Sequence, residues 1–259
     1  MRSKLAAFLI IVVALILAIT SVWDDSPIVD EIPHIGAGYS YIAKGDHRLN
    51  PEHPPLAKDL TGLSLNFLGI KDEAAFTSKF WQQDINGQWE FGRKLIFNSG
   101  NDADQLARYA KMPQLLFFIL SAVIVSAWSR KLYGNKAALI ALFLFSFSPT
   151  VMAHSRFVTT DMPALFGILL ASFFFIKYLE KSTKKNLWLA GLAFGVAQLT
   201  KFSVFLLVPF FVVMTIIYYF LNSPTKKLQV VSYRLLVTGF IVAIGYLFIV
   251  WPVYYFHTW

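Results

Sequence analysis

The chain has 259 residues, of which 56% are hydrophobic and 17% aromatic, with a formal net charge of +8 and no cysteine. Soluble domains rarely have this composition, and the longest apolar runs reach the length of membrane spans. Without cysteine, disulfides and thiolate metal sites are excluded. The basic residues gather in short loops beside apolar runs, a pattern that argues for a membrane protein and against nucleic acid as a partner.

The first apolar run covers residues 5–23 and follows Arg2 and Lys4. A signal peptide begins in the same way, but 19 apolar residues exceed a typical signal core, and Ala18-Ile19-Thr20-Ser21 is a poor cleavage site. We therefore predict that residues 1–23 form a membrane span that is retained.

A polar stretch of 87 residues, 24–110, follows this span. In it we predict a helix that begins at Glu31, is capped by Asp30 and ends at Gly45. One face of this helix is apolar, formed by Ile32, Ile35, Tyr39 and Ile42. Such a helix is expected to lie on the membrane surface.

A second interfacial helix is predicted from Pro55, after the stiff turn Asn50-Pro51-Glu52-His53-Pro54. Its apolar face consists of Leu56, Leu60, Leu63 and Phe67, with Lys58 off that face. Residues 71–108 are polar and aromatic and predict a loop with short interfacial helices.

Six further apolar runs bring the expected number of spans to about seven. They cover approximately residues 112–128, 137–153, 162–179, 187–200, 202–221 and 235–252. The run 187–200 is short for a bilayer, and one long bent helix through Lys201 is the alternative for this region. The expected fold is thus an all-α integral membrane domain over residues 1–259, with six spans in 111–259 and a large outer loop.

Basic residues are unequally divided between the two predicted sides. The inner segments are 1–4, 129–136, 177–186 and 222–234. They carry 12 basic residues and one acid, Glu180, whereas the outer stretch carries 8 basic and 13 acidic residues. Positive charge favours the cytoplasmic side, so we predict a multi-pass protein of the plasma (inner) membrane with a cytoplasmic N-terminus.

Four charged residues fall near membrane depth at the outer face: Lys111, Arg156, Asp161 and Lys201. Charges at such depth are costly and usually functional or interfacial. For Lys111 we expect snorkelling to the headgroups. For the other three, their common side favours a functional role beside Asp30 and Glu31.

Several motifs recur in a characteristic order. They are Asp30-Glu31 after the first span, His53-Pro54-Pro55-Leu56-Ala57-Lys58, His154-Ser155-Arg156 followed by Asp161-Met162-Pro163, and Gly191-Leu192-Ala193 followed by Leu199-Thr200-Lys201. In this order the chain resembles the N-terminal half of the polyprenyl-phosphate-dependent GT-C glycosyltransferases, nearest to the family 39, protein O-mannosyltransferase-like members. Glu52-His53 replaces the Glu-Lys of the aminoarabinose-type members.

The resemblance implies an inverting transfer of a sugar from a polyprenyl-phosphate donor at the extracytoplasmic face, with a protein, lipid or polysaccharide as acceptor. It implies that Asp30, with Glu31 beside it, is the general base, since a carboxylate within reach can take the acceptor's proton. Arg156 would bind the donor phosphate through its bidentate fork. The further substrate-binding candidates are Asp161, His53, Lys58, Lys201, Glu52 and His154.

Some relatives use a metal near the outer loop, and Glu52, His53 and His154 are the candidate ligands for a divalent ion here. Members of the family usually continue through more spans, so we expect the chain to be part of a longer protein, truncated at its C-terminus. Two other functions remain open: a catalytically incomplete protein that binds the lipid carrier or serves as a scaffold, and a small transporter. A transporter usually shows paired repeats and polar mid-span segments, which the sequence lacks.

Overall fold

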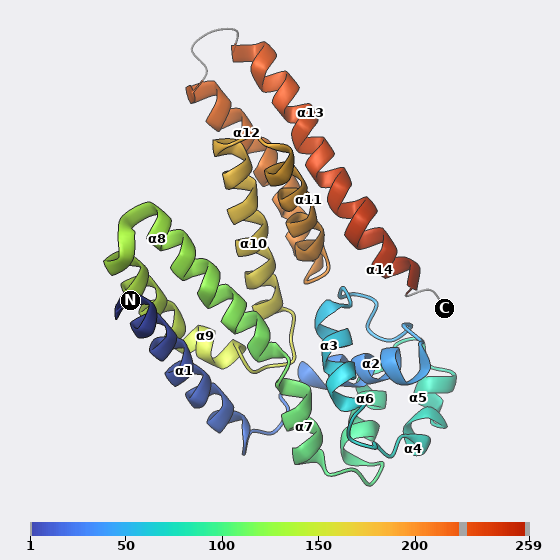
Figure 1. Cartoon of the computed structure of the whole chain (residues 1–259). Helices are drawn as coiled ribbons and strands as arrows, with labels where there is room; N and C mark the ends of the chain where they lie inside the picture. The colour runs from blue at the N-terminus through green and yellow to red at the C-terminus, as the bar shows by residue number, and fades with distance from the viewer. Residues whose placement is uncertain (1, 223–226, 257–259) are drawn as a thin grey trace. The chain divides into compact units, whose positions relative to one another are not determined.

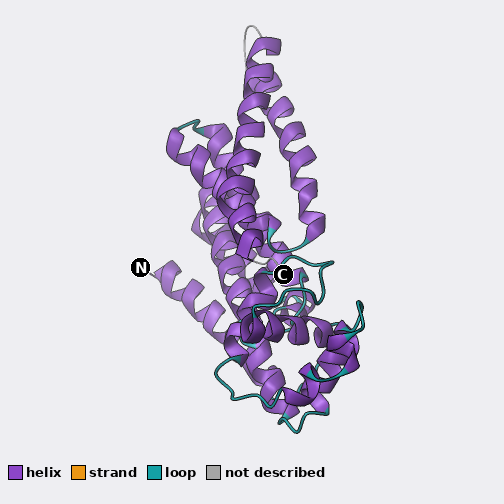
Figure 2. Cartoon of the chain, turned by 90° about the vertical axis from the view of Figure 1, so that its right-hand side faces the viewer, coloured by secondary structure: helices purple, strands orange, loops and turns teal. Residues whose placement is uncertain are grey.

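The computed structural model describes residues 2–222 and 227–256, and all regular structure in these ranges is helical (Figures 1 and 2). Residues 223–226 of the predicted inner segment and the last three residues lie outside this description. The described chain divides between Pro163 and Ala164 into two compact units. The helices of the first unit are α1 (Arg2–Val22), α2 (Glu31–Lys44), α3 (Leu56–Leu65), α4 (Glu73–Phe76), α5 (Lys79–Gln82), α6 (Gln88–Phe97), α7 (Ala103–Lys111), α8 (Gln114–Ser146) and α9 (Pro149–His154).

The second unit begins within α10 and contains the remaining helices. These are α10 (Asp161–Glu180), α11 (Lys184–Gln198), the 3-10 helix η1 (Phe202–Leu206), α12 (Leu207–Asn222), α13 (Lys227–Gly245), the π-helical turn η2 (Tyr246–Val250) and α14 (Trp251–Phe256).

Five helical stretches in the described ranges are long and apolar enough to cross a membrane. They are Arg2–Val22, Ala103–Ser146, Asp161–Glu180, Phe202–Asn222 and Leu228–Tyr255. The prediction of membrane helices is confirmed, but the predicted number of seven is not reached.

One reason for the difference is that α8 reverses direction at Gly134, which has φ 84° and ψ −176° (Figure 1). The rings of Phe118 and Phe145 stack with centroids 6.0 Å apart, although a straight helix would separate them by about 40 Å. The predicted run 112–128 therefore lies mainly on the first arm of a helical hairpin, and the run 137–153 lies on its second arm as far as Ser146 and then on α9. A positive φ favours glycine, which explains the residue at the reversal.

The second reason is α11, whose 15 residues are fewer than a span requires. It ends at Gln198, and Lys201 has an extended backbone (φ −156°, ψ 141°) before η1 begins. The alternative of one long helix through Lys201 is therefore wrong.

Glycines allow close helix contact in the second unit. A Cβ at Gly195 would lie 2.6 Å from the carbonyl oxygen of Gly245, and one at Gly245 would lie 2.7 Å from that of Gly191. Helices α11 and α13 thus approach backbone to backbone, as small residues at helical spacing permit within membranes. Beside them, the rings of Phe175 and Phe211 stack at 3.8 Å in the core of this unit.

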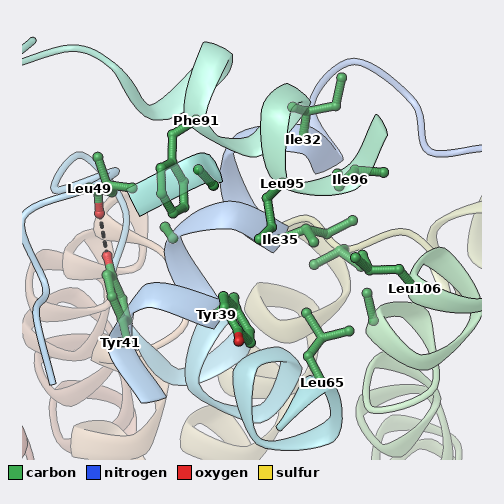
Figure 3. Packing of buried hydrophobic residues seen from close by; sticks show 14 of the residues in the cluster. Ile32, Ile35, Tyr39, Tyr41, Leu49, Leu65, Phe91, Leu95, Ile96 and Leu106 are labelled. Carbon is green, nitrogen blue, oxygen red and sulfur yellow. Dashed lines mark hydrogen bonds between the residues drawn. The ribbon is translucent and has the colours of Figure 1, made fainter. Parts of the chain in front are cut away.

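Helix α2 lies at the centre of the polar stretch and not on a membrane surface. It contacts α3 and α6, and its apolar residues Ile32 and Ile35 are buried against Leu95 (Figure 3). Figure 3 also shows the hydroxyl of Tyr41 donating to the carbonyl of Leu49, at 2.5 Å. The start at Glu31 and the stop at Gly45, with φ 62°, are confirmed, but the prediction of an interfacial α2 is wrong because other helices of the stretch cover its apolar face.

Helix α3 begins after Pro55 as predicted, but its contact face, with Ala57, Lys58, Thr61, Gly62 and Leu65, is opposite to the predicted apolar face. Gly38 of α2 and Gly62 of α3 bring the two backbones together, so that a Cβ at either glycine would meet backbone atoms of the other helix. The predicted apolar face remains exposed at Leu63 and the following Phe67. Lys58 lies off the predicted apolar face, as expected, and this arrangement buries it.

Candidate functional site

Glu31 joins the start of α2 to the loop between α9 and α10. Its side chain is fully buried, and Oε1 accepts the backbone N–H of Val158 at 2.7 Å. Oε2 accepts the backbone N–H of Ile28 at 2.8 Å. A carboxylate with two backbone donors is firmly held, so two segments separated by 127 residues are fixed together.

Asp30 precedes this buried carboxylate but is exposed to solvent. It occupies the N-cap position with helical φ and ψ, and its side chain makes no capping hydrogen bond. The prediction that Asp30 caps the helix is therefore wrong: the N–H of Ile32 donates to the carbonyl of Val29 instead, and Pro33 has no N–H for a cap to accept. Within the described ranges the Asp30 carboxylate is left available to an incoming group.

Lys111 ends α7 with a side chain that has no exposed surface. Its Nζ lies 3.4 Å from Oε2 of Glu31 and donates to the carbonyl oxygens of Asp25 and Ser26, at 3.1 and 3.2 Å. The expectation that Lys111 snorkels to the headgroups is wrong, since an acidic partner is available inside the protein. Sequence reasoning missed this role.

Arg156 is held from the opposite end of the same cluster. Its Nε donates to Oδ2 of Asp25 at 3.0 Å, and Nη1 donates to Oγ of Ser21 at 2.7 Å. Oδ2 of Asp25 also lies 3.4 Å from Nζ of Lys111. Arg156, Asp25, Lys111 and Glu31 therefore form a row of alternating charges, here called the charge chain.

The charge chain leaves some N–H donors of Arg156 available to bind a ligand. A guanidinium carries five N–H donors, and Asp25 and Ser21 occupy two of them. The side chain is partly exposed, at 23%. Asp25 gave no sequence signal beyond its position just after the first span, so its contact with a residue 131 positions away was not foreseen.

The surroundings of Glu31 alter its acidity. Burial raises the pKa of its carboxyl above the usual value, while Lys111 and the N–H groups of Val158 and Ile28 act in the opposite direction. Both carboxylate oxygens already have donors, so a substrate could reach them only after rearrangement. Glu31 is thus better placed to position the loop than to take a proton from substrate.

His154 and Asp161 form a second contact in the first unit, with Nδ1 and Oδ2 3.7 Å apart. Both side chains are substantially exposed, at 41% and 48%. They flank the loop that carries Arg156, because α9 ends at His154 and α10 begins at Asp161. Three of the predicted site residues thus belong to one short segment.

The predicted residues of the outer turn have other surroundings. Glu52 accepts a hydrogen bond from the side-chain amide of Gln88 at 2.6 Å, and the ring of His53 lies 5.0 Å from that of His34. Lys58 is buried, and its Nζ donates to the carbonyl oxygens of Asn50 and His53, at 2.6 and 2.8 Å.

The Nζ of Lys58 also donates to the hydroxyl of Tyr41, at 2.8 Å. Burial lowers the pKa of Lys58 to about 7, with Asp59 and Glu52 opposing the change. These contacts are those of a group that holds the Pro-Pro turn in place.

The remaining predicted site residues do not form a metal-binding group in the described ranges. Lys201 belongs to the second unit and is partly exposed ahead of η1. In the described ranges, no three His, Asp or Glu side chains are grouped so that they could hold a metal ion. Glu52, His53 and His154 therefore do not form the ligand set considered from the sequence.

The chain matches a known protein family. Residues 103–255, more than half of the chain, match the family described as dolichyl-phosphate-mannose-protein mannosyltransferase. The chain belongs to this family. It is accordingly a multi-pass membrane protein of the mannosyltransferase-like glycosyltransferases, and the resemblance read from the sequence is confirmed.

Two similar proteins are longer than this chain. It is similar in fold to the S. cerevisiae protein O-mannosyltransferase Pmt1-Pmt2 complex bound to the sugar donor, with a TM-score of 0.68, 21% identity and coverage of 100% of this chain and 34% of the yeast chain. It is 27% identical over 119 residues to an uncharacterised protein of Aquifex aeolicus, covering 46% of this chain and 23% of that protein. The chain thus spans about a third or less of the length of either.

Proposed function

We propose that this membrane domain transfers a sugar from a polyprenyl-phosphate donor to an acceptor hydroxyl, with inversion, at the extracytoplasmic membrane face. The observation that carries the proposal is the charge chain. It ties the start of α2, where Asp30 precedes Glu31, to the loop after α9 that carries Arg156, and the chain belongs to the family described as dolichyl-phosphate-mannose-protein mannosyltransferase.

Asp30 is the proposed general base. Its carboxylate is exposed and bears no cap interaction, so an acceptor hydroxyl can reach it. As the hydroxyl oxygen attacks the anomeric carbon, its proton passes to Asp30 and the bond from that carbon to the phosphate oxygen breaks. Glu31 is the proposed positioning residue, because it is buried and holds the backbone of Val158.

Arg156 is the proposed partner of the donor phosphate. Glycosyl transfer passes through an oxocarbenium-like state in which negative charge grows on the leaving group. The free N–H donors of Arg156 supply charge-assisted bonds to that phosphate, and Asp25 and Ser21 keep the guanidinium oriented. His154 and Asp161 are proposed substrate contacts at the edge of the same segment, with Lys201, His53 and Glu52 as further candidates.

A transfer assay tests this function. Two kinds of membranes are prepared: one contains the chain alone, and the other contains any longer protein of which the chain is a part. Both are supplied with radiolabelled polyprenyl-phosphate sugars, and the glycosylated product is measured. Sugar transfer that requires the chain supports the proposal. Donor binding without any turnover in either form would contradict it and would assign the chain to the catalytically incomplete carrier-binding class.

A further inference from the structure

A pocket with both polar and apolar lining lies within the second unit, at the end of α10 away from Asp161. It encloses about 380 Å³ between the end of α10, the start of α11 and the first half of α13. Its polar lining comprises Tyr178, Ser182, Thr183, Lys184, Tyr233 and Arg234. We propose that this pocket binds the phosphate of an anionic membrane phospholipid.

Arg234 is the residue that makes this a built site. Its Nη1 donates to the hydroxyl of buried Tyr178 at 3.2 Å, and its Cζ lies 4.9 Å from the ring centroid of Tyr219. No carboxylate in the described ranges forms an ion pair with it. The guanidinium is therefore oriented by aromatic residues while its charge remains uncompensated by an acid, which suits an external anion.

The loop between α10 and α11 completes the polar wall. The hydroxyl of Ser182 lies 3.1 Å from that of Tyr219, and the side chain of Thr183 accepts the backbone N–H of Asn186 as the N-cap of α11. Lys184 follows at the first position of that helix. A lysine and hydroxyl groups at the start of α11, together with the arginine of α13, are the chemistry that recognises a phosphate group.

The apolar wall of the pocket favours a lipid as the source of the phosphate. Leu236 and Phe240 line it and are 75% and 54% exposed, and both lie on the membrane-spanning stretch Leu228–Tyr255. Tyr233, 61% exposed, also lines the pocket, and exposed aromatic residues of this kind mark the membrane boundary. A polar head and an acyl chain can thus be accommodated together, whereas a free phosphate would use only the rim.

The charge around the pocket favours an anionic lipid over a zwitterionic one. Among described side chains, the segment 177–186 holds four lysines and one acid, Glu180, and Arg234 on α13 adds a fifth basic residue. Basic pockets between membrane helices at such a boundary attract anionic headgroups. All residues that line this pocket belong to the second unit and none has a role in the proposed transfer reaction, so the inference does not depend on that reaction.

The test uses the full chain purified in mild detergent, with native mass spectrometry to count bound lipids. Phosphatidylglycerol and phosphatidylcholine with the same acyl chains are titrated, and inorganic phosphate and glycerol 3-phosphate are added in separate arms as competitors. We expect retention of phosphatidylglycerol at least tenfold stronger than that of phosphatidylcholine, with little competition from the soluble phosphates. Equal retention of the two lipids, or complete displacement by millimolar inorganic phosphate, would overturn the proposal.

Variants locate the binding. Arg234→Gln removes the charge and should weaken phosphatidylglycerol retention about tenfold, while Arg234→Lys should retain part of it. Lys185→Gln is the matched control, because Lys185 is exposed on α11 next to the pocket residue Lys184 and does not itself line the pocket. Val237→Trp fills the pocket without changing charge, and it keeps the test decisive if Arg234→Gln unfolds. Wild-type retention by every variant that remains folded would refute the assignment.

Discussion

The Oε2 atom of Glu31 lies 3.4 Å from the Nζ atom of Lys111, and neither side chain has any exposed surface. Both charged groups have lost their contact with water, so each is stabilised in its charged form by the other. The pair fixes the relation between α2 and the end of α7. Through Asp25 it extends to Arg156, which links the stability of the first unit to the proposed phosphate partner.

The first prediction concerns this pair. Lys111→Met should lower the free energy of unfolding by about 3–5 kcal/mol, because it leaves the carboxylate of Glu31 buried without its cation. Glu31→Leu combined with Lys111→Met should cost much less than the sum of the single changes, since neither charge is then left alone. Thermal unfolding of the purified variants in detergent measures both values. Simple additivity of the two changes would show that the pair is not coupled.

Lys58 supports a prediction with a pH dependence. Lys58→Met removes the donor from the carbonyls of Asn50 and His53 and from Tyr41, and should cost about 3 kcal/mol. The folded-state pKa is lowered to about 7 from a usual 10.5, so between these values the unfolded chain binds a proton that the folded chain has released. Wild-type stability should therefore rise with pH in that window and lose this contribution as pH falls towards 7.

The measurement is the melting temperature of wild type and of Lys58→Met between pH 7 and pH 9. The difference between the two proteins should widen as pH rises. Lys71→Met is the control, since Lys71 is exposed, and it should track wild type. A difference that stays constant or narrows would show that Lys58 is not the titrating group.

The glycine contact between α2 and α3 predicts a steric effect. Gly62→Ala places a Cβ against the carbonyl of Gly38 and should destabilise the first unit by several kcal/mol, because the obstacle is backbone and cannot move aside easily. Gly239→Ala is the matched change in a helix of the second unit, where no atom lies within 4 Å of the added Cβ. Chemical unfolding of both variants should show a loss for the first and none for the second. Similar behaviour of the two would argue against close packing of α2 on α3.

Arg156 leads to a prediction about donor binding. Arg156→Lys keeps a positive charge but loses the planar fork, so affinity for the polyprenyl-phosphate donor should fall at least tenfold. Arg130→Lys, in the α8 hairpin, should leave the affinity unchanged. Equilibrium binding of a labelled donor to detergent-solubilised protein gives both values. Equal affinities in the two variants would remove Arg156 from the donor site.

Several elements could be predicted from local sequence because their signals are local. Helix α2 begins at Glu31 and ends at Gly45, as its apolar spacing and its glycine indicate. The membrane helices follow from run length, and the reversal at Gly134 coincides with the basic segment between two apolar runs.

The contacts of the charge chain could not be predicted in this way. Lys111 meets Asp25 and Arg156 meets Ser21 across 86 and 135 residues, and no periodicity marks such pairs. The apolar face of α2 indicates that this face is shielded from water. The sequence does not show whether protein side chains or lipid chains shield it, because both are apolar. Only the packing through Gly38 and Gly62 decides that α2 lies inside the protein and that Lys58 is buried.

The central claim is that Asp30 takes the proton of the acceptor. Its most direct test is the rate of sugar transfer from a polyprenyl-phosphate donor by Asp30→Asn, compared with wild type and with Asp104→Asn, an exposed acid on α7, in membranes with equal amounts of protein. The account predicts that Asp30→Asn lowers the rate at least a hundredfold with donor binding and thermal stability intact, and that Asp104→Asn has no effect. A wild-type rate in Asp30→Asn would contradict the claim.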